Sequence, residues 1–125
     1  MNPIMVDTDV LVWVLRGHTA AITWLEQAAS QGRLCCSSLT VSEILRMVRQ
    51  DEIRKTDALI AGLDVVPVYE DDALKAADLM RDRGPGYGDC HIAAQAFRLK
   101  APIMTCNRQD FIRTGIPLMD PPDKV

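Results

Sequence analysis

Five acidic residues lie where a strand is expected to end or a helix to begin: Asp7, Asp9, Glu43, Asp89 and Asp110. Carboxylates that lie close together repel one another, and folding them into one place lowers stability unless a cation neutralises them. Ligand sets made only of oxygen suit hard cations such as Mg²⁺ or Mn²⁺. The five acids therefore predict a site for a divalent cation.

Taken one at a time, the same acids also have structural explanations. Glu43 follows Thr40 by three residues, which is the spacing of a capping box at the start of a helix. Asp89 and Asp110 lie where the positive end of a helix dipole stabilises a carboxylate, and Asp7 can be a turn residue that ends a strand. These explanations do not account for all the acids lying at neighbouring strand ends, so we favour the metal site.

The elements that must position these acids are short apolar strands that alternate with amphipathic helices. This pattern is typical of a parallel sheet covered by helices on both faces, in which ligands bind at the carboxyl ends of the strands. We therefore predict an α/β fold, a three-layer sandwich with a central, mostly parallel sheet, in one domain over residues 1–125. The expected strands cover residues 4–6, 34–36, 65–69, 102–105 and 116–119. The expected helices cover residues 19–31, 40–48, 51–63, a segment from Asp71 or Asp72 to just before Gly84, and 89–99.

Composition is typical of an ordinary globular domain. The 125 residues are 48% apolar and 25% charged, with 14 Lys and Arg against 17 Asp and Glu. The longest apolar runs fall far short of the roughly 20 residues that cross a bilayer, and the N-terminus lacks the pattern of a secretory signal. We therefore expect a cytoplasmic protein with no membrane segment. The acidic balance argues against binding nucleic acid by charge alone, although the chain is mildly basic once the five acids are set aside.

The four cysteines are Cys35, Cys36, Cys90 and Cys106. Their spacing does not match the metal fingers, so we expect buried, reduced thiols rather than a zinc site that includes His91. His91 is expected to be mainly structural.

Four segments carry a resemblance to a known family. They are M-V-D-T-D-V-L at residues 5–11, L-T-V-S-E-I at 39–44, G-D-C-H-I-A-A-Q-A at 88–96 and T-C-N-R-Q-D-F at 105–111. In order and spacing they resemble the PIN-domain family, and they are most similar to the VapC-type ribonuclease toxins of type II toxin–antitoxin systems. The resemblance extends from Ile4 to about Pro121.

The resemblance implies roles for the residues at matching positions. The first three acids of the family correspond to Asp7, Glu43 and Asp89, and the fourth to either Asn107 or Asp110, of which only Asp110 carries a negative charge. These four acids would be both catalytic residues and ligands of one or two Mg²⁺ ions, for which Mn²⁺ can substitute. Supporting roles are expected for Thr8, Asp9, Thr105 and Asn107, with Asp9 on the same side of an extended chain as Asp7.

The reaction implied is metal-assisted hydrolysis of an RNA phosphodiester, which leaves a 5′-phosphate and a 3′-hydroxyl. A bound metal would lower the pKa of a water molecule and offset the charge that develops on the phosphate. The cations expected near the acids are Arg46, Arg49 and Arg108, which would either grip phosphates or form weak surface ion pairs. Tyr87, in the glycine-rich loop before Asp89, would cover the site or fill a gap.

The resemblance also implies partners. VapC-type toxins are usually homodimers, and a small antitoxin silences them by laying a tail across the active-site groove, in a heterotetramer or a larger assembly. An antitoxin Arg or Lys in the acidic cluster would compete with metal and RNA. Trp13, Leu15, Trp24 and the apolar face of residues 51–63 would either line that groove or pack in the core, and we favour the core.

Two other functions remain as alternatives. D-T-D-V-L also matches the opening motif of haloacid-dehalogenase-type phosphatases, in which Asp7 would be a covalent nucleophile and Asp9 a general acid. That family needs a second acid shortly after Gly88-Asp89, and residues 90–94 contain none. The second alternative is a catalytically silent PIN-like binding module, for which a cluster of mutually repelling acids would have no use.

Overall fold

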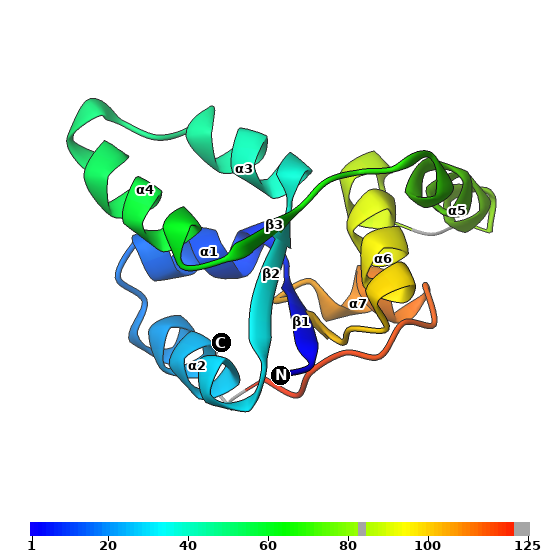
Figure 1. Cartoon of the computed structure of the whole chain (residues 1–125), viewed down its shortest axis with the longest axis horizontal. Coiled ribbons are helices and arrows are strands. Elements are labelled where there is room, and N and C mark those ends of the chain that lie inside the picture. The colour runs from blue at the N-terminus through cyan, green and yellow to red at the C-terminus, as the bar shows by residue number, and fades with distance from the viewer. Residues whose placement is uncertain (83–84, 122–125) are drawn as a thin grey trace.

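A single four-stranded sheet runs through the computed structural model, which describes residues 1–82 and 85–121 (Figure 1). All neighbouring strands are parallel, and their order is β3-β2-β1-β4. The first strand of the chain is therefore central, with Ile4 opposite Leu34 on one side and Met5 opposite Ile103 on the other. The strands are β1 (Pro3–Val6), β2 (Arg33–Ser37), β3 (Asp64–Val66) and β4 (Ile103–Met104).

Helices cover both faces of this sheet, so the predicted α/β three-layer sandwich is confirmed (Figure 1). One face is covered by α1 (Thr8–Leu15), α2 (Thr19–Gln31), α3 (Ser38–Leu45) and α4 (Ile53–Ala61), which a short 3₁₀ helix, η1 (Gln50–Glu52), precedes. The other face is covered by α5 (Glu70–Arg81), α6 (Tyr87–Leu99) and α7 (Arg108–Ile112).

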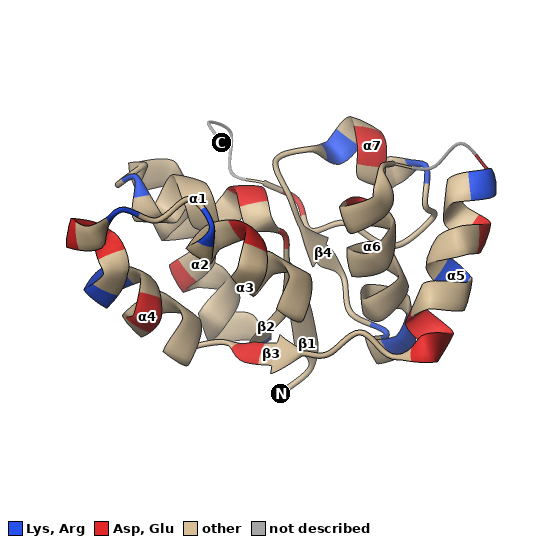
Figure 2. Ribbon diagram, turned by 90° about the horizontal axis from the view of Figure 1, so that it is seen from above, with Lys and Arg blue, Asp and Glu red and all other residues tan. Residues whose placement is uncertain are grey.

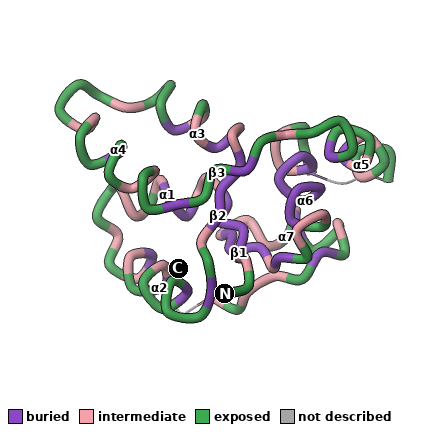
Figure 3. Tube along the Cα trace, in the orientation of Figure 1, coloured by how far each residue is buried: buried purple, intermediate pink, exposed green. Residues whose placement is uncertain are grey.

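Strand β1 supplies side chains to the core on both faces, because successive residues of a strand point to opposite sides of the sheet. Ile4 and Val6 pack with residues of α1, α2 and α3, whereas Met5 packs with α6 and α7. Figure 3 shows that buried residues are concentrated in the central strands and along α6. The continuous apolar run of β1 thus follows from its burial on both faces.

Helix α1 differs from the expectation that the chain stays extended through Asp9. Asp7 is the N-cap of this helix, and its Oδ1 accepts a hydrogen bond from the Thr8 backbone N–H at 2.9 Å. The helix therefore starts directly after β1, and the expected strand-like alternation of Asp7 and Asp9 is wrong. The helical signal is hidden by β-branched residues, since α1 reads T-D-V-L-V-W-V-L and valine favours strands.

The N-termini of two other helices also differ from expectation. Helix α3 begins at Ser38, because the Ser37 side chain accepts a hydrogen bond from Leu39 N–H at 3.0 Å. The expected start at Thr40 is therefore wrong, and Thr40 lies inside the helix. Thr19 is the expected cap of helix α2, but His18 is the N-cap and Thr19 is the first residue of the helix.

The remaining differences lie in the later part of the chain. The helix expected over residues 51–63 is divided into η1 and α4, and β3 ends at Val66, one residue before a proline. Residues 116–119 do not form a strand: Leu118 makes one isolated parallel bridge to Ile103. Gly84, at the start of the expected glycine-rich loop, lies outside the described residues.

Across residues 1–82 and 85–121, no helix combines the length and apolar character needed to cross a membrane. All four cysteines are free thiols: Cys35, Cys36 and Cys90 are buried as expected, whereas Cys106 is partly exposed.

Candidate active site at the carboxyl edge of the sheet

The predicted acids come together at the edge where β1 and β4 end. Figure 2 looks onto this edge, with acidic segments of α1 and α3 on one side of β4 and those of α6 and α7 on the other. Asp9, Asp89 and Asp110 lie in the first turns of α1, α6 and α7, and Glu43 lies in α3. The parallel sheet therefore brings together residues from four helices and from the end of β1.

Asp7 is nearly buried, with 4% of its surface exposed, and two neighbours fix its carboxylate. Its Oδ1 accepts from Thr8 N–H, and its Oδ2 accepts from Thr105 Oγ1 at 2.8 Å. Thr105 Oγ1 also lies 3.5 Å from Asp9 Oδ2, and Cys106 N–H donates to Asp9 Oδ1 at 3.3 Å. Thr105 thus links the end of β4 to both acids that follow β1.

Glu43 is held from the opposite side by hydroxyl groups. Thr8 Oγ1 donates to Glu43 Oε1 at 3.0 Å and lies 2.9 Å from Thr40 Oγ1. The proposed capping box of Thr40 and Glu43 is therefore wrong: because α3 starts at Ser38, neither residue is at its N-terminus. Sequence reasoning assigned Thr40 only to a helix cap and missed its place beside this site.

Asn107 lies between the third and fourth acids. Its Nδ2 donates to Asp110 Oδ2 at 2.9 Å and to Asp89 Oδ2 at 3.4 Å, while its backbone N–H donates to Thr105 Oγ1 at 2.9 Å. Both candidates for the fourth position, Asn107 and Asp110, are thus at the site. The amide is neutral, so it holds two carboxylates near each other without cancelling their charge.

Neighbouring acids raise the pKa values of Asp7 and Asp89. Burial, then the charge of Asp9 and, more weakly, that of Asp89 raise the pKa of Asp7 well above its usual value, against the hydrogen bond from Thr105. Burial followed by the charges of Asp9, Glu43 and Asp110 also raises the pKa of Asp89. Each acid therefore lies in the electric field of the others, and the edge carries excess negative charge.

The chemistry of these donors fits a hard divalent cation. Carboxylate oxygens predominate, the charge is negative, and hydroxyl groups orient two of the acids. As they stand, no three Asp, Glu, His or Cys side chains within residues 1–82 and 85–121 are close enough together to share one ion.

The three expected RNA-binding arginines have different surroundings. Arg46 is exposed at the C-cap of α3, and Arg49 is exposed at the start of η1, where its backbone N–H donates to Glu52. Arg108 Nη1 donates to the Met119 carbonyl at 2.7 Å, a structural contact that the sequence did not predict. Their contact with RNA stays a prediction.

The aromatic residues and His91 that the sequence singled out divide into core and surface. Trp24 is buried as expected, whereas Trp13 is 42% exposed. Tyr87 is 67% exposed, so it does not fill a gap, and its ring packs 4.3 Å from that of His91. His91 is buried, and its Nδ1 lies 2.7 Å from the Tyr87 carbonyl oxygen, which agrees with a structural role.

Comparison with known proteins identifies a family that matches most of this chain. The sequence model of the PIN domain matches residues 4–117. Ribonuclease VapC10 from Mycobacterium tuberculosis is 39% identical over 98 residues, which cover 74% of this chain and 74% of that protein.

Solved structures show the same fold. The structure of VapBC2 from Rickettsia felis bound to a DNA fragment from their promoter has a TM-score of 0.82 at 19% identity, over 97% of this chain and 99% of that chain. A toxin–antitoxin complex from Klebsiella pneumoniae has a TM-score of 0.80 at 21% identity, over 95% and 98% of the two chains.

The family match does not favour the alternative of a haloacid-dehalogenase-type phosphatase. It covers all four sequence segments and every element that contributes an acid to the edge. With its sheet order, its acidic edge and its similarity to a VapC ribonuclease, the chain belongs to the PIN domain family.

Proposed function

We propose that the protein is a divalent-cation-dependent endoribonuclease and the toxin of a toxin–antitoxin pair, neutralised by a small antitoxin. The observation that carries the proposal is the gathering of five acids at one sheet edge, where neighbouring carboxylates raise the pKa values of Asp7 and Asp89. The 39% identity to ribonuclease VapC10 supports RNA as the substrate. The cation we propose is Mg²⁺, with Mn²⁺ as a substitute.

Four acids would hold the cation: Asp7, Glu43, Asp89 and Asp110. When bound, a divalent cation lowers the pKa of a water molecule and offsets negative charge on the phosphate. Thr105 orients Asp7, Thr8 orients Glu43, and Asn107 keeps Asp89 and Asp110 together. Their fixed positions reduce the reorganisation that binding requires.

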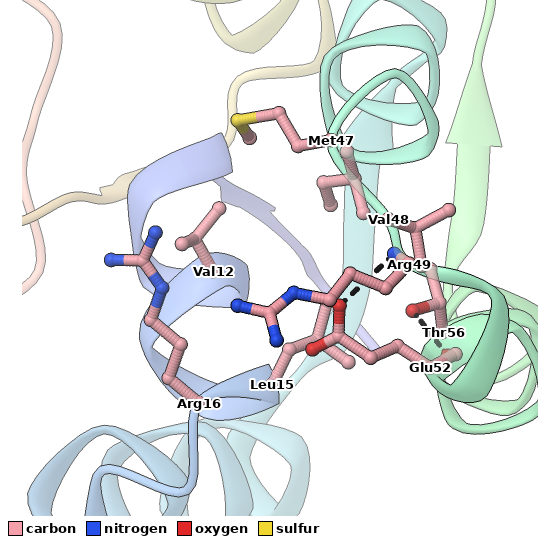
Figure 4. Close-up of a pocket in the computed structure, with 9 residues that line it drawn as sticks. Val12, Leu15, Arg16, Met47, Val48, Arg49, Glu52 and Thr56 are labelled. Atoms are coloured by element: carbon pink, nitrogen blue, oxygen red, sulfur yellow. Dashed lines mark hydrogen bonds between the residues drawn. The ribbon is translucent and has the colours of Figure 1, made fainter.

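A groove of about 180 Å³, built partly by the helices α1 and α3 that also carry Asp9 and Glu43, supports the antitoxin part of the proposal (Figure 4). It lies between α1, the end of α3 and the segment from Val48 to Thr56. Its walls combine apolar side chains with two arginines and one acid, Glu52, so the charged lining residues are net positive, which suits a peptide with apolar residues and an acidic group. Leu15 is the one expected groove residue that lines it. The apolar and basic lining residues are Val12, Leu15, Ile44, Met47, Val48, Arg16 and Arg49.

Calorimetric titration of Mn²⁺ into the antitoxin-free protein tests the metal site. We expect the wild type to bind Mn²⁺ and to cleave RNA into products with a 5′-phosphate, and we expect Asp7→Asn and Asp89→Asn to weaken both activities. Asp78→Asn is the matched control, because Asp78 is an exposed acid that pairs with Arg81 far from the edge. Absence of Mn²⁺ binding by the folded wild type would overturn the nuclease proposal and favour a silent binding module.

Co-expression with the product of the adjacent gene tests the antitoxin. We expect the complex to cleave no RNA, and we expect Arg49→Glu, which reverses a charge in the groove, to weaken the complex. Full cleavage by a stable complex would contradict neutralisation at this site.

A further inference from the structure

Two threonine hydroxyls from different helices form a short chain that ends on Glu43. Thr40 has no exposed surface, and its Oγ1 lies 2.9 Å from Thr8 Oγ1. Thr8 Oγ1 lies 3.0 Å from Glu43 Oε1. Thr8 and Thr40 are 32 residues apart in the sequence, so the chain links the first turn of α1 to α3.

The direction of these hydrogen bonds follows from the number of hydrogens. A carboxylate only accepts, and each hydroxyl has a single hydrogen to donate. Thr8 therefore donates to Glu43, which leaves Thr40 to donate to Thr8. The order of donation is Thr40 to Thr8 to Glu43.

Glu43 depends on this chain of hydroxyls more than Asp7 depends on either of its contacts. Thr8 is its hydrogen-bond partner within the described part of the chain, whereas Asp7 accepts from both Thr8 N–H and Thr105. Glu43 and Asp89 also repel each other, because the charge of Glu43 raises the pKa of Asp89. A glutamate side chain has more rotamers than an aspartate side chain, so the one donor to Glu43 must restrict a larger number of conformations.

We propose that Thr40 is a positioning residue for Glu43. By donating to Thr8, it fixes the direction of the Thr8 hydroxyl hydrogen and holds the Glu43 carboxylate toward the other acids. The inference rests on the proposed function, because the orientation of Glu43 matters for cation binding at the edge. Without the Thr40 hydroxyl, Thr8 still reaches Glu43 but is free to rotate toward solvent.

Substitution of Thr40 by an isosteric residue tests the proposal. Thr40→Val keeps the side-chain shape and removes the donor, and we expect it to weaken Mn²⁺ binding in calorimetry by about tenfold, as loss of an outer partner of a metal ligand does. We expect the kcat of RNA cleavage to fall while KM changes little. Thr40→Ser restores the hydroxyl and should return the Mn²⁺ affinity to within about twofold of wild type.

A matched control separates positioning from loss of stability. Thr56 is also buried, with 1% of its surface exposed, and its Oγ1 donates to the Glu52 carbonyl at 2.9 Å (Figure 4). Thr56→Val removes a buried hydroxyl without touching an acid of the edge. We expect it to lower the urea midpoint about as much as Thr40→Val and to leave the Mn²⁺ affinity unchanged.

A double-mutant cycle tests whether Thr40 acts through Thr8. We expect Thr8→Val to weaken Mn²⁺ binding, and the Thr8→Val/Thr40→Val double variant to be no weaker than Thr8→Val alone. If the two substitutions weaken Mn²⁺ binding additively, Thr40 does not act through Thr8 and the proposed relay of hydrogen bonds is overturned. Should Thr40→Val not fold, Thr40→Cys, with a weakly donating thiol of similar size, takes its place in the cycle.

The outcomes separate the two proposals. If the wild type binds Mn²⁺ and Thr40→Val binds it equally well, the role of Thr40 is overturned and the proposed nuclease stands. If the folded wild type binds no Mn²⁺, the proposed function is overturned, and the role of Thr40 with it.

Discussion

Asp7 and Asp72 are the same amino acid with similarly little of their surfaces exposed, 4% and 1%, in two different regions of the molecule. Asp72, between α5 and α6, accepts two hydrogen bonds from Arg98, at 2.8 and 3.0 Å, and one from Tyr69 N–H at 2.9 Å. Burial acts to raise the pKa of Asp72, but these partners outweigh it and the pKa is lowered. At Asp7, burial and the neighbouring acids act together, and the pKa is raised.

The difference lies in where the compensating charge comes from. Between α5 and α6 the chain supplies its own cation, so the buried carboxylate stabilises the fold. At the carboxyl edge, within the described residues, no Lys or Arg forms an ion pair with Asp7, Glu43 or Asp89. The negative charge of these acids is therefore not neutralised by an ion pair within the described chain, and a cation from solution can neutralise it.

The largest expected effect is on cleavage. Asp7→Asn removes a proposed metal ligand, so we expect the initial rate of RNA cleavage to fall by a factor of about 100 or more. We also expect the free energy of unfolding without metal to stay constant or rise, because a buried, repelled charge is removed. Cleavage assays and urea unfolding on one preparation measure both quantities. A clear loss of stability would show that the Asp7 carboxylate, like that of Asp72, stabilises the fold.

Added metal should stabilise the folded protein only through the acids of the carboxyl edge. At a free Mn²⁺ concentration 100 times its Kd, binding to the folded state adds about 2.7 kcal/mol to the free energy of unfolding. We expect this gain in the wild type and in Asp72→Ala, and little of it in Asp7→Asn. Urea titrations with and without Mn²⁺ give the comparison, and an equal gain in Asp7→Asn would place the ion elsewhere.

Asp72→Ala should have the opposite profile from Asp7→Asn. It leaves Arg98 without its partner, and we expect the free energy of unfolding to fall by about 2 kcal/mol, toward the low end for such pairs because Arg98 remains 30% exposed. The kcat for RNA cleavage should stay near that of wild type at temperatures where the variant is folded. Circular dichroism under the assay conditions verifies the folded fraction.

The two aspartates should also respond oppositely to pH. Between 3.8 and its raised folded-state pKa, Asp7 binds more protons in the folded than in the unfolded protein, so metal-free stability falls as pH rises through this window. Asp72 has a lowered folded-state pKa, so the stability that it contributes is complete above 3.8 and is lost as pH falls through that lower value. Urea midpoints from pH 3 upward should show the first slope reduced in Asp7→Asn and the second reduced in Asp72→Asn.

The smallest effect is expected for an exposed ion pair. Arg33 and Asp64 are 2.5 Å apart, but their side chains are 48% and 55% exposed. Asp64→Ala should change the free energy of unfolding by less than about 1 kcal/mol and leave cleavage unchanged. A larger loss would show that an ion pair in this protein can contribute strongly to the free energy of unfolding even when both side chains are exposed.

The sheet and the gathering of the acids were predictable because both depend on short-range patterns. Apolar strand segments determine which residues lie at the carboxyl edge, and the parallel arrangement brings those ends together. Asp89 and Asp110 could be placed there without knowledge of any side-chain contact.

The hydroxyl contacts were not predictable, because they depend on how one helix is rotated against another. The valines of α1 concealed a helix, so Asp9 was assigned to the edge on the basis of a wrong conformation. Thr40 fitted a helix cap, and only the packing of α1 on α3 shows that its hydroxyl faces Thr8. Its one sequence signal was a threonine within the first turns after a strand, as Thr8 is after β1.

The central position of β1 has a consequence for synthesis. Ribosomes release the N-terminus first, yet β1 pairs with β4, and Asp7 meets Thr105 across 98 residues of chain. Such long-range pairing is slow to form, and a nascent chain that has not yet reached Thr105 lacks one wall of the acidic edge. A copy still under translation is therefore incomplete at this edge until Thr105 has emerged.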